Sequence, residues 1–339
     1  MNGPERCSRR FRGGVDVLPR FLIRRFAYAA LALGAISLLA FVFADVAPGD
    51  FFDDTRLNPQ VSPAAAEALR NRYGFHRPLL QKYAAWLVSG IHGDFGVSFA
   101  YGTPAGGLLW PRAGNTLLLS LAAELAAWGI ALPWGVWSAS RRGRWAGAAG
   151  NAVSALLLAI PEVAILCGLL LIAAKTGAFP VSGMHSLASE GAGAIARGRD
   201  VAWHLALPAL ALALVALPTL YRHVRAAVRE ASEAPFVRNA RAFGCPESRL
   251  LFRHVLPAAA SPIVTLLGFS FGGMLSASLL TEAMFGWPGL GPLLLDAILA
   301  RDTYLIVDSV VLSAAFLLAG NLAADLVHFA LDPRIRVER

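Results

Sequence analysis

Six long apolar runs are the feature that most limits what this chain can fold into. They cover about residues 26–44, 116–137, 151–174, 201–221, 261–280 and 305–330. An α-helix needs about 20 apolar residues to cross the hydrocarbon core of a bilayer. The chain is 56% hydrophobic and only 15% charged, which favours the same class of protein. The sequence therefore predicts an all-α membrane protein with six transmembrane helices.

The basic residues indicate which ends of the predicted helices face the cytoplasm. Of the 30 lysines and arginines, 20 lie before the first run, after the second, after the fourth and after the sixth. The other 10 are spread over much longer segments on the opposite side. Because cytoplasmic loops carry the excess of positive charge, both termini are expected in the cytoplasm. The net charge of +8 is then a sign of orientation rather than of nucleic-acid binding.

The segments outside the runs complete this organisation. Residues 1–25 are predicted to be a basic cytoplasmic N-terminus, residues 26–44 the first transmembrane helix, and residues 45–114 an external region. Residues 115–331 hold the five other transmembrane helices, and residues 332–339 form a cytoplasmic tail. Asn115 has the side chain of a helix cap and is expected to begin the second transmembrane helix.

The segment Ala231–Pro257 lies between the fourth and fifth runs and is the most charged internal stretch of the chain. Gly244 is predicted to divide it into two short helices, because glycine adopts the left-handed cap conformation without strain. Pro246 suits the start of the second helix. Leu256 and Pro257 are expected to end it, since a residue before proline avoids the helical region. Small and basic side chains in this segment favour docking of a second protein.

Several kinds of chemistry are not supported by the sequence. A phosphate-binding loop needs a lysine after glycine, but the only lysines, Lys82 and Lys175, follow Gln81 and Ala174. No HExxH pair and no cysteine cluster is present. We therefore predict no catalytic residues, no metal site and no cofactor on this chain, so any ATP would be used by another subunit.

Polar residues within the predicted transmembrane helices are candidates for a translocation path. These are Glu124, Glu162, Ser270 and Ser276. For the two glutamates, a structural hydrogen bond between helices is an equal alternative, and a proton-coupled secondary transporter is a second class of function. Asp308 and Asp325 are expected to reach the membrane surface. The Gly272-Gly273 pair predicts close packing of the fifth transmembrane helix.

A family resemblance is specific in the charged segment. Ala240-x3-Gly244-x9-His254-x-Leu256-Pro257 resembles the EAA loop of ABC importer permeases, whose pattern is EAA-x3-G-x9-I-x-LP. It departs from the pattern at Arg238 and Asn239, where Glu and Ala would stand, and at His254, where Ile would stand. Other matches to the dipeptide, oligopeptide and nickel branch occur in the same order along the chain. They include Ala47-Pro48-Gly49-Asp50, Gly93-Asp94-Phe95-Gly96, Trp287-Pro288-Gly289-Leu290-Gly291 and Leu331-Asp332-Pro333-Arg334.

The resemblance implies a fold and a set of partners. The expected fold is the type I ABC importer permease bundle with a cytoplasmic coupling helix, in a bacterial cytoplasmic (inner) membrane. The expected partners are a second homologous permease, two ATPase subunits that hold ATP-Mg, and an external solute-binding protein. Peptides are the expected solute, with nickel or another non-peptide solute as the alternative.

The resemblance also assigns roles to residues of this chain. The residues expected to couple to the ATPase are Arg238, Asn239, Ala240, Arg241, Gly244, Leu256 and Pro257. The residues expected at an external gate or at the contact with the binding protein are Glu282, Trp287, Pro288 and Gly289.

Overall fold

The computed structural model describes residues 17–47, 77–140, 144–189 and 193–331, with residues 49, 51, 68, 71 and 191 between them. The elements in these ranges are α2 (Val17–Val46), α5 (Leu79–Ile91), β1 (Val97–Ser98), β2 (Thr103–Pro104), α6 (Ala105–Ala139), α7 (Arg144–Ala159), α8 (Glu162–Thr176), the 3-10 turn η3 (Leu187–Ser189), α9 (Ala194–Ser232), α10 (Pro235–Ala242), α11 (Glu247–Leu250), the π-helical turn η4 (Leu251–Val255), α12 (Leu256–Phe285), α13 (Leu290–Leu299) and α14 (Thr303–Leu331). The first 16 residues of the predicted N-terminal segment and the predicted tail 332–339 lie outside the described residues.

Five helices in the described part are long and apolar enough to cross a bilayer. They are α2, α6, α9, the helical run Glu247–Phe285 that ends with α12, and α14. The sixth predicted span is the pair α7 and α8, whose axes are bent by 99°. The expectation of one continuous helix over residues 151–174 is therefore wrong. Pro161 lies at the bend with a ψ of 142°, and the residue before a proline is driven out of the helical region.

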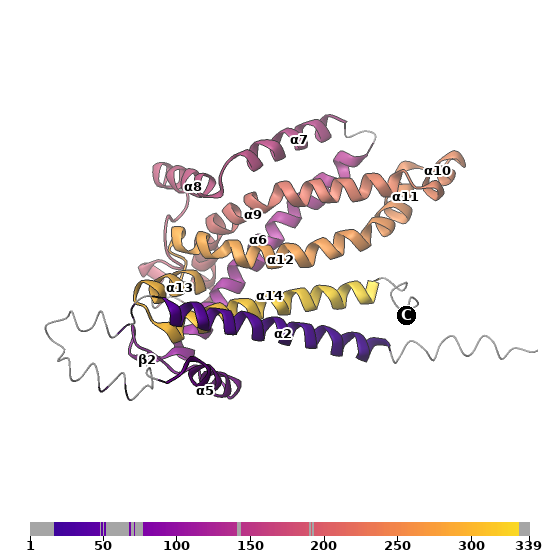
Figure 1. Ribbon diagram of the computed structural model, residues 1–339. Helices are drawn as coiled ribbons and strands as arrows, with labels where there is room; N and C mark the ends of the chain where they lie inside the picture. The colour runs from indigo at the N-terminus through magenta and orange to yellow at the C-terminus, as the bar shows by residue number, and fades with distance from the viewer. Residues whose placement is uncertain are drawn as a thin grey trace, which may run out of the picture.

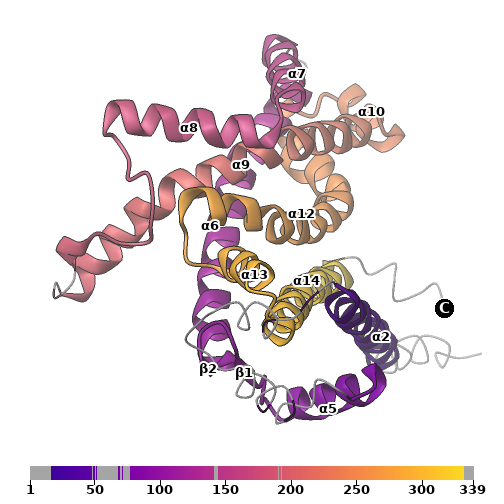
Figure 2. The ribbon, with the colours of Figure 1, turned by 60° about the vertical axis from the view of Figure 1, so that its left-hand side comes forward.

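The long helices lie side by side, and the short elements gather at the two ends of the bundle (Figure 1). One end carries α10 and α11, together with the start of α2 and the end of α14. The other end carries α5, α13 and the antiparallel hairpin of β1 and β2. Figure 2 shows α8 turning away from the bundle. The start of α2 and the end of α14 therefore lie at the same end of the bundle as the segment Ala231–Pro257.

The helices α6 and α9 pack together through small residues. Ala123, Ala127 and Ala131 follow one another at every fourth position of α6 and are buried in the largest apolar cluster. Gly135 continues this stripe, and a Cβ there would lie 2.7 Å from the Cγ1 of Val224 in α9. Small side chains let two helix backbones approach closely, which is how helices associate where lipid provides no hydrophobic driving force.

The contact between α12 and α14 uses glycine in the same way. A Cβ added at Gly268 would overlap Ala324, and one added at Gly272 would lie 2.5 Å from the Cδ1 of Leu317. The prediction of close packing is thus confirmed for Gly272. Gly273 faces open space, with no atom near an added Cβ.

The first turns of α6 correct the predicted boundary at residue 115. The helix begins at Ala105, directly after the hairpin, so Asn115 lies inside it and does not cap it. Asn115 Nδ2 instead donates a hydrogen bond of 2.8 Å to the carbonyl oxygen of Pro288. The residue is thus a tether between α6 and the turn after α12.

Asp308 also lies in a different environment from the one expected. It is 1% exposed, because α5 covers it and Trp86 Nε1 donates a hydrogen bond of 2.8 Å to its Oδ1. Phe41 of α2 packs against Trp86, so the contact joins three helices. Asp325 fits the expectation better, since it is partly exposed and lies 2.8 Å from the guanidinium of Arg25.

We predict that Gly272→Leu destabilises the protein by about 1–3 kcal/mol, because the larger side chain overpacks the contact with α14. Gly273→Leu is the matched control, since it makes the same change one position along the same helix. Thermal unfolding of the two purified variants in detergent measures the difference. Equal unfolding temperatures for Gly272→Leu and Gly273→Leu would contradict the packing described here.

Candidate functional site

The segment Ala231–Pro257 is called the coupling loop below, after the role that the family resemblance implies. It has the predicted division into two short helices at Gly244, and this bend is called the elbow. Pro235 opens α10, and Gly244 has a φ of +76°, in the left-handed region that favours glycine. Pro246 immediately precedes α11 rather than forming its first residue. Arg241 Nε donates a hydrogen bond of 2.8 Å to the Oε1 of Glu247 and so links the two short helices across the elbow. The glycine and the ion pair together define the angle between α10 and α11.

One face of the coupling loop is anchored in the bundle. Val237 of α10 and Leu250 of α11 are buried in the same apolar cluster as Val228 and Val255, from α9 and η4. The burial of these side chains fixes the loop to the ends of two long helices.

The opposite face of the coupling loop is exposed. Phe243 is 91% exposed beside Gly244, and Phe252 is also exposed. Neither ring was among the contacts predicted from the sequence. A signal was present, because Phe243 and Phe252 are bulky apolar residues in a segment otherwise rich in charge. Exposed aromatic rings of this kind are typical anchors of protein interfaces.

The predicted coupling residues are distributed over both faces of the loop. Arg238, Asn239 and Gly244 are exposed, whereas Ala240 and Arg241 are partly buried. The guanidinium of Arg241 is occupied by Glu247 within the chain. Arg238 is therefore the better candidate to form an ion pair with an acidic group on a partner.

Leu256 and Pro257 do not end the second helix, contrary to the prediction. Helical structure continues from α11 through η4 into α12. Pro257 lies in the first turn of α12, where its missing N–H costs little, and the π-helical turn before it changes the hydrogen-bond register. As a result, the residues from Glu247 to Phe285 form one continuous helical segment.

Two of the four candidate path residues meet inside the bundle. Glu124 of α6 is buried, and its Oε1 accepts hydrogen bonds from Ser270 Oγ of α12 and from Trp128 Nε1, the latter at 2.8 Å. Glu162 is the partly buried first residue of α8, and Ser276 is exposed on α12. No contact recorded in the described ranges joins either of them to Glu124. The arrangement supports a joint between α6 and α12 at Glu124.

The turn after α12 is built around a buried carboxylate. Glu282 Oε2 accepts a hydrogen bond of 2.7 Å from the N–H of Gly291. A Cβ at Gly289 would overlap the carboxylate of Glu282, which explains glycine there. Trp287 is fully buried and donates through Nε1 to the carbonyl of Asn115 at 2.9 Å. Glu282, Trp287 and Gly289 therefore shape the turn from inside, and Pro288 is partly exposed.

Within the residues that the structure describes, no three histidine, cysteine, aspartate or glutamate side chains form a group that could hold a metal ion. The coupling loop is the candidate functional site.

Comparisons with known proteins identify the family of this chain. Residues 131–337 match the family described as binding-protein-dependent transport system inner membrane component. The oligopeptide transport system permease protein AppB of Bacillus subtilis is 35% identical, over 93% of this chain and 98% of AppB. The dipeptide transport system permease protein DppB of Escherichia coli K12 is 29% identical, over 94% of this chain and 98% of DppB.

A solved structure of the inward-facing MetNI methionine ABC transporter is also similar, with a TM-score of 0.49 and 17% identity, over 66% of this chain and 96% of that chain. The family match covers more than half of this sequence, and the relatives are matched over nearly their whole length. This protein therefore belongs to the binding-protein-dependent transport system inner membrane component family, as a multi-pass permease subunit without an ATPase site of its own.

Proposed function

We propose that this chain is one of two homologous permease subunits of a peptide importer, and that two ATPase subunits drive it through the coupling loop. The relatives named for oligopeptide and dipeptide transport support peptides as the solute. The observation that carries the coupling role is the elbow at Gly244, which is continuous with helices on both sides. The proposed orientation has both termini and the coupling loop in the cytoplasm, as the distribution of basic residues indicates.

The helices on either side of the loop suit the transmission of movement. The 39-residue helix α9 leads into the loop, and the run Glu247–Phe285 leads out of it. A displacement of α10 and α11 would tilt both helices, because Val237 and Leu250 lock the loop to their ends. Converting a 1:99 mixture of two conformations into a 99:1 mixture needs about 5.5 kcal/mol of differential binding, so the docked loop has to be rigid.

The exposed side chains of the loop support a docking surface for the ATPase. Phe243 supplies an apolar anchor beside the open space at Gly244, and Arg238 supplies an exposed positive charge. Aromatic residues and arginine dominate the energetics of protein interfaces. In this proposal, Arg241 maintains the elbow through Glu247.

For the solute path we propose the region around Glu124 and Ser270, where two transmembrane helices are joined in the interior of the bundle. Glu162 and Ser276 remain candidates on other surfaces. For the external gate we propose the turn held by Glu282, in which Trp287 and Gly289 act by positioning the backbone. The partly exposed Pro288 is the candidate for contact with the binding protein.

Gly244→Arg is predicted to leave the transporter assembled and hydrolysing ATP while uptake falls about tenfold or more, the effect of losing about 1.4 kcal/mol of docking energy. The left-handed conformation itself disfavours an L-residue by about 1–2 kcal/mol. Gly177→Arg is the matched control for this strain, because Gly177 also has a positive φ of 63° and open space around it. Uptake and ATPase activity of both variants are measured in proteoliposomes that contain the complete transporter.

Equal loss of uptake in the Gly177 and Gly244 variants would attribute the effect to backbone strain and contradict the coupling role. Normal uptake in Gly244→Arg would contradict it as well.

Peptides are predicted to be the solute that the complete transporter, supplied with its binding protein, carries into proteoliposomes. Uptake of labelled di- to octapeptides is expected to be blocked by vanadate and to survive an uncoupler, because ATP and not a proton gradient drives it. Uptake of a nickel chelate without any peptide uptake would contradict the proposed solute. Loss of peptide uptake with the uncoupler alone would contradict the proposed energy source.

A further inference from the structure

We propose that a cavity beside the coupling loop binds the headgroup of an anionic phospholipid, and that an apolar groove next to it on α6 receives the acyl chains. This site lies on the permease itself and is separate from the solute path. It goes beyond the proposed function, since it names a lipid as a ligand of the chain.

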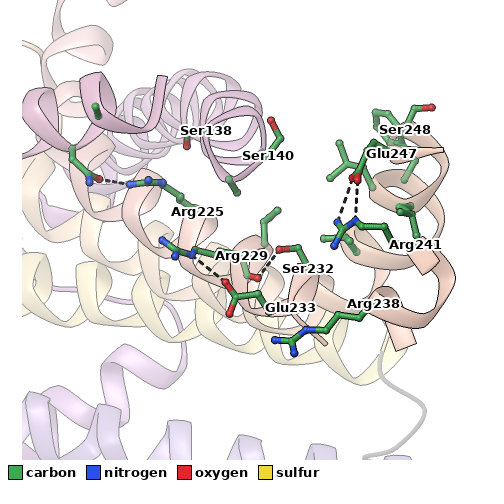
Figure 3. A pocket seen from close by; sticks show the side chains of 18 residues that line it. Ser138, Ser140, Arg225, Arg229, Ser232, Glu233, Arg238, Arg241, Glu247 and Ser248 are labelled. Atoms are coloured by element: carbon green, nitrogen blue, oxygen red, sulfur yellow. Dashed lines mark hydrogen bonds and ion pairs between the residues drawn. The ribbon is translucent and has the colours of Figure 1, made fainter. Parts of the chain in front are cut away.

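The cavity has a volume of about 1300 Å³ and lies between the end of α6, the start of α7, the end of α9 and the coupling loop. Figure 3 shows arginine side chains arranged around it. Its charged lining residues are Arg225, Arg229, Arg238, Arg241, Glu233 and Glu247. The lining is therefore positive overall, which suits a phosphate group.

The hydrogen bonds around the cavity leave positive charge uncancelled. Arg225 donates to Asn151 Oδ1 at 2.5 Å, and this partner is a neutral amide. Arg229 lies 3.4 Å from Glu233, in an ion pair that is largely exposed and thus weak. The most compensated arginine is Arg241, which contacts both carboxylate oxygens of Glu247. A phosphate in the cavity would add the missing negative charge beside Arg225 and Arg229.

The apolar groove is lined by Ile130, Pro133, Trp134 and Trp137 and has a volume of about 570 Å³. Residues at this spacing share one face of a helix. Ser138, one turn beyond Trp134, lines the charged cavity. The groove and the cavity therefore follow one another along the same helix.

The neighbouring helix α9 repeats this order. The ring of Trp134 lies 5.0 Å from the ring of Tyr221, measured between centroids. One turn beyond Tyr221, Arg225 lines the cavity. Both helices thus change from aromatic to polar at the same level, as expected where acyl chains give way to headgroups.

Two exposed tryptophans support the same position for the boundary between acyl chains and headgroups. Trp137 near the end of α6 is 61% exposed, and Trp145 at the start of α7 is 89% exposed. Tryptophan is enriched at the boundary between hydrocarbon and headgroups. Basic pockets between transmembrane helices at this boundary are suited to anionic headgroups. A soluble phosphate could bind the arginines, but it has no apolar part that would fill the groove.

Native mass spectrometry of the complete transporter, purified through a tag on this chain, tests the site. The complex is titrated with phosphatidylglycerol and, in parallel, with phosphatidylcholine. Phosphatidylglycerol is expected to bind, and the double variant Arg225→Gln/Arg229→Gln to weaken this binding about 30-fold, at about 1 kcal/mol for each arginine near the membrane surface.

The matched control is Arg222→Gln, which removes the same charge from an exposed position of α9 that does not line the cavity. Its affinity for phosphatidylglycerol is expected to change much less than that of the cavity double variant, because Arg222 does not line the cavity. The variant Arg225→Lys/Arg229→Lys keeps the charge and is expected to recover most of the binding, which separates loss of charge from loss of folding.

Four outcomes would overturn the proposal. One is equal binding of phosphatidylglycerol and phosphatidylcholine, and another is an equal effect of the Arg222 variant and the cavity double variant. The third is lipid binding by the isolated permease but not by the complete transporter, since the cavity would then belong to the contact with the ATPase. Glycerol phosphate without acyl chains is expected not to displace the lipid, and efficient displacement would assign the cavity to a soluble anion.

Discussion

The bilayer imposes the constraint on which the rest of this structure depends. Backbone N–H and C=O groups find no water in the hydrocarbon core, so a spanning segment has to satisfy them within its own helix. Helices of this kind associate through close packing rather than through the hydrophobic effect. The contacts of Gly135 with Val224 and of Gly272 with Leu317 show how this chain meets that requirement. In a bundle whose helix backbones pack closely, neighbouring helices move together. A loop at the end of the bundle that binds a partner can therefore transmit the partner's movement to the helices.

The coupling loop suits this role because one of its faces is anchored in the bundle and the other is exposed, where a partner would bind. Val237 and Leu250 are buried, while Phe243 projects from the elbow at Gly244. The helical continuity from α11 through η4 into α12 strengthens this view, since no non-helical residue separates α11 from the transmembrane part of the run. The same loop borders the arginine-lined cavity, so the proposed docking surface and the proposed lipid site lie at the same end of the molecule.

Local chemistry explains which features could be predicted from the sequence and which could not. The left-handed elbow at Gly244 and the apolar spans follow from the residues themselves, and both were expected. Proline was less informative, because Pro161 accompanies a sharp bend whereas Pro133, Pro208 and Pro218 lie inside long helices. The neighbours in three dimensions decide between these outcomes. The burial of Asp308 likewise depends on Trp86, a residue far away in the sequence.

The membrane side and the surroundings of the elbow test the central claim most directly. Cys245 is partly exposed in the coupling loop and can serve as the only thiol once Cys7 and Cys167 are replaced by serine. A membrane-impermeant maleimide is applied to right-side-out and to inverted vesicles. The account predicts labelling of Cys245 in inverted vesicles only, with less labelling when the ATPase subunits are assembled on the permease. Labelling from the outer side, or labelling that is unchanged by the ATPase, would contradict it.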